Sequence, residues 1–86
     1  MDPWEIILYP YMTEKSIKNI ATTNEIVFIV TRASTKKQIK WAVQRLFEVK
    51  VKSIRTLIDT NGTKKAFVKL MPEFKATDIA TKFGML

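Results

Sequence analysis

Ile26-Val27-Phe28-Ile29-Val30 is an unbroken run of β-branched and aromatic residues in a chain of 86 residues. These residue types favour strands, and a run without apolar–polar alternation is typical of a strand covered on both faces. We therefore expect residues 26–30 to form a buried strand, with other elements of the chain packed on each side of it.

The clearest helical pattern follows this strand. Thr35 and Gln38 have the spacing of a capping box, and Ser34 is a competing N-cap. Apolar residues then recur at i, i+3, i+4 and i+7, which predicts a buried stripe made of Ile39, Ala42, Val43 and Leu46. The lysines of this helix and Trp41 point away from that stripe.

Two further strands, joined by a hairpin, are expected after the helix. Residues 49–52 (VKVK) alternate as a half-buried strand does, and the phase then slips, which predicts a bulge near Ser53. Asn61-Gly62 is a hairpin signal. The returning strand, 64–71, buries Ala66, Val68 and Leu70 and turns out Lys65, Phe67 and Lys69.

The two ends of the chain carry weaker signals. Residues 4–9 could be extended, Thr13 is a candidate N-cap for a short helix, and a last helix could start at 77–78 and end at Gly84. The order of elements predicts an α+β fold in a single domain, 1–86. We expect a small, mostly antiparallel sheet of three to four strands with helices packed on it, in a ferredoxin-like split β-α-β arrangement.

The composition argues against catalysis. The chain has no cysteine and no histidine, and we find no Gly-rich phosphate loop and no nucleophile–base pair. Glu14 and Asp59 fit structural roles, in a helix cap and a turn. We therefore expect no catalytic residue, no metal site and no cofactor. No apolar run is long enough to span a membrane, and no export signal is apparent, so we expect a cytoplasmic protein without membrane insertion.

Positive charge is concentrated in one part of the chain. Residues 32–69 contain eleven Lys/Arg and two acids, a net charge of +9, whereas the other residues contain four Lys/Arg and six acids, a net charge of −2. This concentration of positive charge indicates a polyanionic partner, and nucleic acid is the first candidate. Lys36 and Lys37 lie in the first turn of a helix, where free N–H groups could meet a phosphate.

Two aromatic residues leave alternatives open. Phe67 between Lys65 and Lys69 could stack on a base or pack on a sugar, or it could be covered by the terminal helix or by Trp4. Trp41, on the charged side of its helix, is either an anchor for a partner or lies under a neighbouring loop.

Several motifs, in order, resemble the family of large ribosomal subunit protein 23, the universal ribosomal protein beside the polypeptide exit tunnel. They are residues 10–15 (PYMTEK), 33–40 (ASTKKQIK), 42–51 (AVQRLFEVKV), 56–57 (TL) and 64–70 (KKAFVKL). Bacterial members have a long basic loop between the last two strands, where this chain has the tight turn 59–63. Eukaryotic members carry a long basic N-terminal extension that is not seen here. The chain is similar to archaeal members.

The resemblance implies a structural role in the large ribosomal subunit. The expected partners are large-subunit ribosomal RNA near the exit tunnel, neighbouring ribosomal proteins such as protein 29, and the signal recognition particle and translocon. The glutamate with which bacterial members dock a chaperone corresponds to Glu14, which together with Trp41 is the candidate for protein docking. The candidate RNA-binding residues are Lys15, Arg32, Lys36, Lys37, Lys40, Lys50, Lys52, Arg55, Lys64, Lys65 and Lys69.

Three other classes of protein have a similar size. An RNA-recognition-motif domain, which binds single-stranded RNA, would share residues 66–68 (AFV), but Lys65 and Leu70 stand where its flanking aromatic residues are needed. A ferredoxin-like protein-interaction module would not need +9 in one stretch. An acylphosphatase-like enzyme would need a phosphate loop that we do not find.

Overall fold

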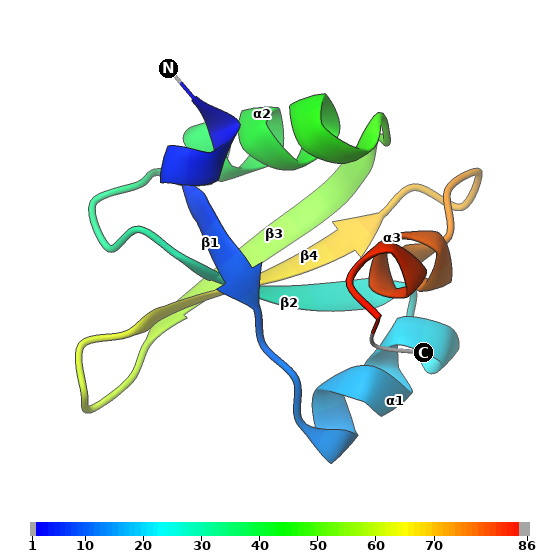
Figure 1. Cartoon of the computed structure of the whole chain (residues 1–86), viewed down its shortest axis with the longest axis horizontal. Coiled ribbons are helices and arrows are strands. Elements are labelled where there is room, and N and C mark those ends of the chain that lie inside the picture. Colours follow the sequence, from blue (N-terminus) through cyan, green and yellow to red (C-terminus); the bar gives the residue numbers. More distant parts are fainter. Residues whose placement is uncertain (1, 85–86) are drawn as a thin grey trace.

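A four-stranded antiparallel sheet, in the order β1-β2-β4-β3, organises the molecule (Figure 1). The computed structural model describes residues 2–84. Its strands are β1 (Ile7–Pro10), β2 (Glu25–Val30), β3 (Val51–Ile58) and β4 (Lys64–Leu70). Its helices are the 3₁₀ turn η1 (Pro3–Glu5), α1 (Glu14–Thr22), α2 (Lys36–Phe47) and α3 (Ala76–Lys82).

Strand β2 is the inner strand that the sequence indicates. All six of its residues are buried, and it pairs with β1 on one edge and β4 on the other. Both β2 and β3 run antiparallel to β4, so they are parallel to each other, with α2 as their connection and β4 between them. This is the predicted split β-α-β arrangement, and the α+β fold is confirmed.

One face of the sheet carries the main core, under α2 and α3. Phe28 of β2 stacks on Phe47 of α2 with ring centroids 5.7 Å apart, and the edge of Phe83 meets both rings. The predicted stripe of α2 is confirmed, with Leu46 half-buried and Phe47 added to it. From α3, Ile79 enters the same core. Each Å² of apolar surface that is buried contributes about 25 cal/mol to the free energy of folding, so this cluster is the main source of stability.

Local capping explains where the helices begin. The Thr35–Gln38 capping box of α2 forms as predicted, with the Gln38 N–H donating to Thr35 Oγ1 at 3.2 Å. Helix α1 has its own box, in which Thr13 pairs with Ser16 instead of Glu14. Glu14 therefore makes no cap, although it lies in the first turn, where a negative charge is favourable.

The β3–β4 hairpin also follows its local signals. The register shifts between Val51 and Ser53, which confirms the predicted bulge. Gly62 has φ +81°, a backbone conformation that glycine adopts without steric cost. The Asp59 carboxylate accepts hydrogen bonds from the N–H groups of Asn61 and Thr63, at 2.9 and 3.0 Å, which confirms its role in the turn.

The N-terminal segment differs from the expectation of an extended stretch at 4–9. Trp4 and Glu5 belong to η1, because the Asp2 carboxylate accepts from the Trp4 N–H at 2.9 Å and Pro3 favours a helical first turn. The strand begins only at Ile7, and Pro10 is its last residue instead of the residue after it.

The loop between β4 and α3 is held against the start of β2 by Asn24. Its side-chain amide donates to the carbonyl of Phe74 at 2.8 Å, and its side-chain oxygen accepts from the N–H of Ala76 at 2.7 Å. Asn24 has φ +57°, which asparagine tolerates better than most residues. One side chain thus joins segments about fifty positions apart in the sequence.

We predict that Asn24→Ala lowers the free energy of unfolding by about 2–3 kcal/mol, because it leaves two backbone groups without partners. Urea denaturation measures this loss. Relative to the wild type, the variant's amide hydrogen exchange should increase most in α3. Asn24→Gly removes the same bonds but tolerates positive φ, so it should cost less than Asn24→Ala. An Asn24→Ala protein as stable as the wild type would contradict the role assigned to this side chain.

Candidate nucleic-acid interface

A groove between the first half of α2 and β3 is lined by lysines. Lys36, Lys37 and Lys40 come from the helix and Lys52 from the strand, with Val51 and Ile54 among the apolar lining residues. All the charged residues that line it are therefore positive. The first-turn lysines sit at the positive end of the helix dipole, an unfavourable place for a cation without an anion. We call this feature the α2–β3 groove.

The second cationic surface is the sheet face opposite α2 and α3, which we call the outer sheet face. Strand pairing aligns its side chains in three rows across β2, β4 and β3. These rows are Ile29-Lys65-Leu57, Val27-Phe67-Arg55 and Glu25-Lys69-Ser53. Residues opposite one another on paired strands lie close enough for their side chains to interact. The face therefore mixes cations with apolar and aromatic groups.

Phe67 lies at the centre of the outer sheet face. The Arg55 guanidinium stands over its ring, 4.8 Å from the centroid, and also pairs with Glu25 at 3.3 Å. Trp4 packs instead against Phe83, and α3 faces the core, so the expectation that either of them covers Phe67 is wrong. The Arg55 side chain is 70% exposed, so its ion pair is worth little and it stays accessible to a partner.

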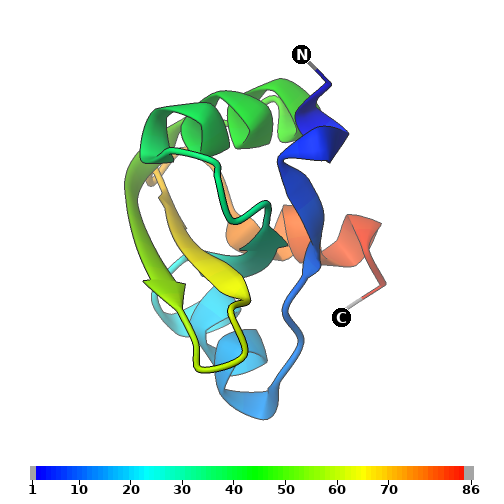
Figure 2. The same ribbon diagram turned by 90° about the vertical axis from the view of Figure 1, so that its left-hand side faces the viewer.

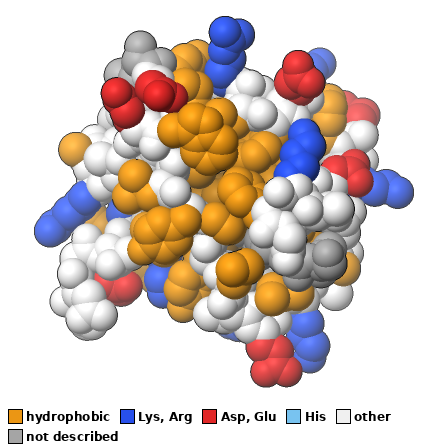
Figure 3. Space-filling view, viewed as in Figure 1, with side chains coloured by type: hydrophobic (Ala, Val, Ile, Leu, Met, Phe, Trp, Pro, Cys, Tyr) orange, Lys and Arg blue, Asp and Glu red, His pale blue; other side chains and the backbone are white. Residues whose placement is uncertain are grey.

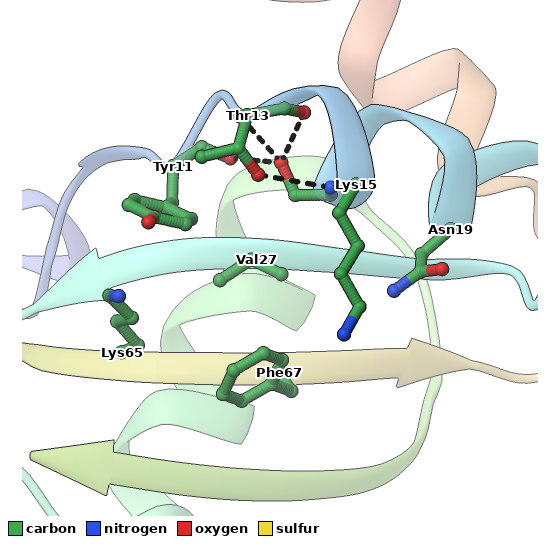
Figure 4. A pocket seen from close by; sticks show the side chains of 8 residues that line it. Tyr11, Thr13, Lys15, Asn19, Val27, Lys65 and Phe67 are labelled. Carbon is green, nitrogen blue, oxygen red and sulfur yellow. Dashed lines mark hydrogen bonds between the residues drawn. The ribbon is translucent and has the colours of Figure 1, made fainter.

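A pocket of about 220 Å³ opens between α1 and the outer sheet face (Figure 4). Phe67 and Val27 lie on its sheet side, and Lys15 reaches down from α1 toward them. On the other side, the Lys65 ammonium lies 4.2 Å from the centroid of the Tyr11 ring. Sequence reasoning singled out both lysines and Phe67, but it did not bring Tyr11, Val27 or Asn19 to the same place.

The groove and the outer sheet face meet along β3. This strand is an edge strand, and Figure 2 shows it at the side of the sheet, with α2 at one end. Ser53 lines the groove and also belongs to a row of the outer sheet face. The α2 lysines of the groove and the β4 lysines of the outer sheet face, more than twenty positions apart in the sequence, thus belong to surfaces that meet at β3, and we call the two together the cationic strip.

Arg32 and Lys64 lie elsewhere, where the β2–α2 loop meets the β3–β4 hairpin. The Lys64 ammonium donates to the carbonyl of Arg32 at 3.4 Å and to that of Ser34. A Cβ on Gly62 would be 3.3 Å from Nη1 of Arg32, so the guanidinium lies close to the turn. Lys64 thus has partners within the protein, and its contact with RNA stays a prediction, as does that of the exposed Lys50.

The two residues predicted to dock proteins are both exposed. Glu14 lies in the first turn of α1, and Trp41 on α2 has 41% of its surface accessible. Of the alternatives for Trp41, this exposure favours an anchor over burial under a loop. Neither residue lines the α2–β3 groove or the pocket between α1 and the outer sheet face.

Residues 2–84 contain no group of three or more acidic side chains placed to hold a metal ion. Within the same residues, no helix has the length and apolar character needed to cross a membrane.

The fold and its cationic strip define a small basic α+β protein of the kind that binds polyanions. A family model described as ribosomal protein L23 matches residues 5–76, which include all four strands, α1 and α2. The chain belongs to this family. It is a structural constituent of the large ribosomal subunit in the cytoplasm, with ribosomal RNA and ribosomal proteins as partners, and the family is not one of enzymes.

We predict that Lys64 contributes more to the stability of the folded protein than Lys36 does. Lys64→Gln should lower the free energy of unfolding by about 1–2 kcal/mol, because charged hydrogen bonds to two loop carbonyls are lost. Lys36→Gln, on the exposed first turn of α2, should change it by less than about 0.5 kcal/mol. Thermal and urea unfolding followed by circular dichroism measure both. Equal effects of the two substitutions would contradict the structural role of Lys64.

Proposed function

We propose that the chain binds large-subunit ribosomal RNA near the polypeptide exit tunnel, with the cationic strip along β3 as the contact surface. The observation that carries this proposal is the α2–β3 groove, whose charged lining residues are all lysines. In a ribosomal protein, the polyanion available to such a groove is ribosomal RNA. Neutralisation by RNA would offset the repulsion among these ammonium groups.

The proposed mode of recognition uses shape more than base identity. Lysines have no acceptor and bind phosphates as point charges, whereas the exposed Arg55 can form paired hydrogen bonds to phosphate oxygens. The N–H groups of Lys36 and Lys37 add donors at the end of the groove, since the capping box uses that of Gln38. The candidate contacts in the groove are Lys36, Lys37, Lys40 and Lys52, and those on the outer sheet face are Arg55, Lys65, Lys69 and Lys15.

We predict that Lys36→Gln/Lys37→Gln/Lys52→Gln weakens binding to an exit-tunnel fragment of large-subunit ribosomal RNA. Each lost phosphate contact should lower the slope of log K against log[salt] by about 0.7–0.9, so the triple variant should lose about two to three units of slope. Filter binding over a potassium chloride series measures both the affinity and the slope.

The matched control is Lys18→Gln/Lys75→Gln/Lys82→Gln, which removes the same charge from exposed positions on α1, before α3 and on α3. We expect it to lose much less affinity than the groove variant. Equal losses in the two triple variants would mean that only net charge matters and would reject the groove. An unrelated structured RNA tests specificity, and it should bind more weakly to the wild type.

The opposite edge of the sheet suits protein neighbours. Figure 3 shows apolar side chains gathered on the face that carries η1 and β1. The large apolar residues exposed in this part of the chain are Trp4, Leu8, Tyr9 and Met12. Exposed apolar groups in such number indicate a protein contact. We propose neighbouring ribosomal proteins, protein 29 among them, as the partners of this face, and of Trp41 on α2.

We further propose that Glu14 contributes to docking of the signal recognition particle and the translocon at the exit. Its support is its exposure at the start of α1, in the motif that bacterial members use for docking a chaperone. Large subunits carrying Glu14→Lys should bind the signal recognition particle at least roughly tenfold more weakly, because the substitution reverses the charge at the proposed contact. Sedimentation of the particle with purified subunits measures this. Glu73→Lys, on another exposed acid, is the control, and unchanged binding by the Glu14 variant would reject the proposal.

A further inference from the structure

The pocket under α1 has walls of two chemical kinds. Its apolar side consists of Val27, which is 2% exposed, and the half-exposed rings of Tyr11 and Phe67. Its polar side carries the ammonium groups of Lys15 and Lys65 (Figure 4). Flat aromatic surfaces beside cations are the combination that proteins use to hold an unstacked base together with its phosphate.

The hydroxyl groups at the pocket's upper edge serve the fold. Ser16 Oγ donates to the carbonyl of Tyr11 at 2.8 Å and accepts from the N–H of Thr13 at 2.8 Å. Thr13 Oγ1 accepts from the N–H of Ser16. These bonds fix the turn that places Tyr11 opposite Phe67. Recognition then falls to the lysines and to the Asn19 side chain, which Figure 4 shows at the end of the pocket beside Lys15.

The size of the pocket limits its occupant. Sites for drug-sized ligands measure roughly 300–1,000 Å³, and this pocket is smaller, at about 220 Å³. It is also open on one side, so an occupant could remain joined to a longer chain. A single ring system that projects from a polymer satisfies both conditions.

We propose that this pocket binds one extrahelical nucleotide of a structured RNA. The base packs against Phe67 and Tyr11, the Asn19 amide lies within reach of its polar edge, and Lys15 and Lys65 meet the adjoining phosphate. This inference rests on the proposed RNA binding and deepens it, because it adds a site for one unpaired base to a surface that otherwise contacts phosphates. An acidic peptide would use the two cations but would gain nothing from the aromatic faces, so the rings favour a base.

The test uses the full chain and two RNA hairpins of equal length and charge, one with a single bulged 2-aminopurine and one fully paired. Base–aromatic stacking is worth about 1–3 kcal/mol, so the wild type should bind the bulged hairpin roughly 5–100-fold more tightly. Fluorescence anisotropy measures both affinities, and the 2-aminopurine emission should change on binding. Phe67→Leu should abolish the preference, so that the variant binds the bulged and the paired hairpin with equal affinity.

Two further variants keep the test decisive. Trp41→Leu removes an aromatic ring outside the pocket and should keep the preference. Asn19→Asp leaves the sheet untouched and places a carboxylate beside Lys15 and the bound nucleotide, so it should reduce the preference even if Phe67→Leu folds poorly. Circular dichroism checks the fold of each variant.

The outcomes separate this inference from the proposed function. Equal affinity of the wild type for the two hairpins would overturn the nucleotide pocket while leaving RNA binding intact. Failure to bind either hairpin at low salt would overturn both. Tighter binding of a glutamate-rich peptide than of the bulged hairpin, lost in Lys15→Gln, would reassign the pocket to a protein partner.

Discussion

The burial of β2 on both faces is the constraint on which the other features depend. On the core face, its side chains are covered by α2 and α3. On the outer sheet face, Val27 and Ile29 are also apolar and buried, and α1 lies across the pocket from Val27 (Figure 4). The side chains beside them include Tyr11, the paired Phe67 and the apolar stem of the paired Lys65. The need to bury one strand thus produces a surface of aromatic rings and ammonium groups, and that surface is the candidate site.

Charge in the groove works against the isolated protein. Exposed lysines in the first turn of α2 cost about a few tenths of a kcal/mol each at the positive end of the helix dipole. Lys52 approaches the same groove from β3 and adds to the repulsion. The well-formed capping box of Thr35 and Gln38 and the buried stripe of α2 stabilise the helix in spite of this cost. Local stability is therefore supplied by caps and core, which leaves the exposed positions free to meet a polyanion.

Local signals in the sequence predicted most of the fold. The β2 run, the α2 capping box, the bulge near Ser53 and the turn at Gly62 each depend on residues within a few positions of one another. The β3–β4 hairpin also places Arg55 over Phe67. The rest of the candidate site depends instead on pairing between strands far apart in the sequence, which brings Tyr11 beside Lys65. No short pattern encodes that register. The same limit hid the bonds of Asn24 to the α3 loop and those of Lys64 to the β2–α2 loop. The left-handed conformation of Glu48, at φ +55°, gave no signal because glycine is the usual residue there.

The order of the strands also separates the two kinds of surface. Because β1 and β3 are the opposite edges of the sheet, the apolar residues around β1 and the cationic strip along β3 are kept apart by the two inner strands. A protein neighbour at β1 and an RNA at β3 would then not compete for the same side chains. The pocket under α1 lies between these edges, with Tyr11 following β1 and Phe67 on β4. A nucleotide held there would connect the RNA-facing edge to the segment that leads into Glu14 and α1. If that segment moved when a protein docked, Tyr11 in the pocket would move with it, because the Thr13–Ser16 bonds fix the turn that joins Tyr11 to α1.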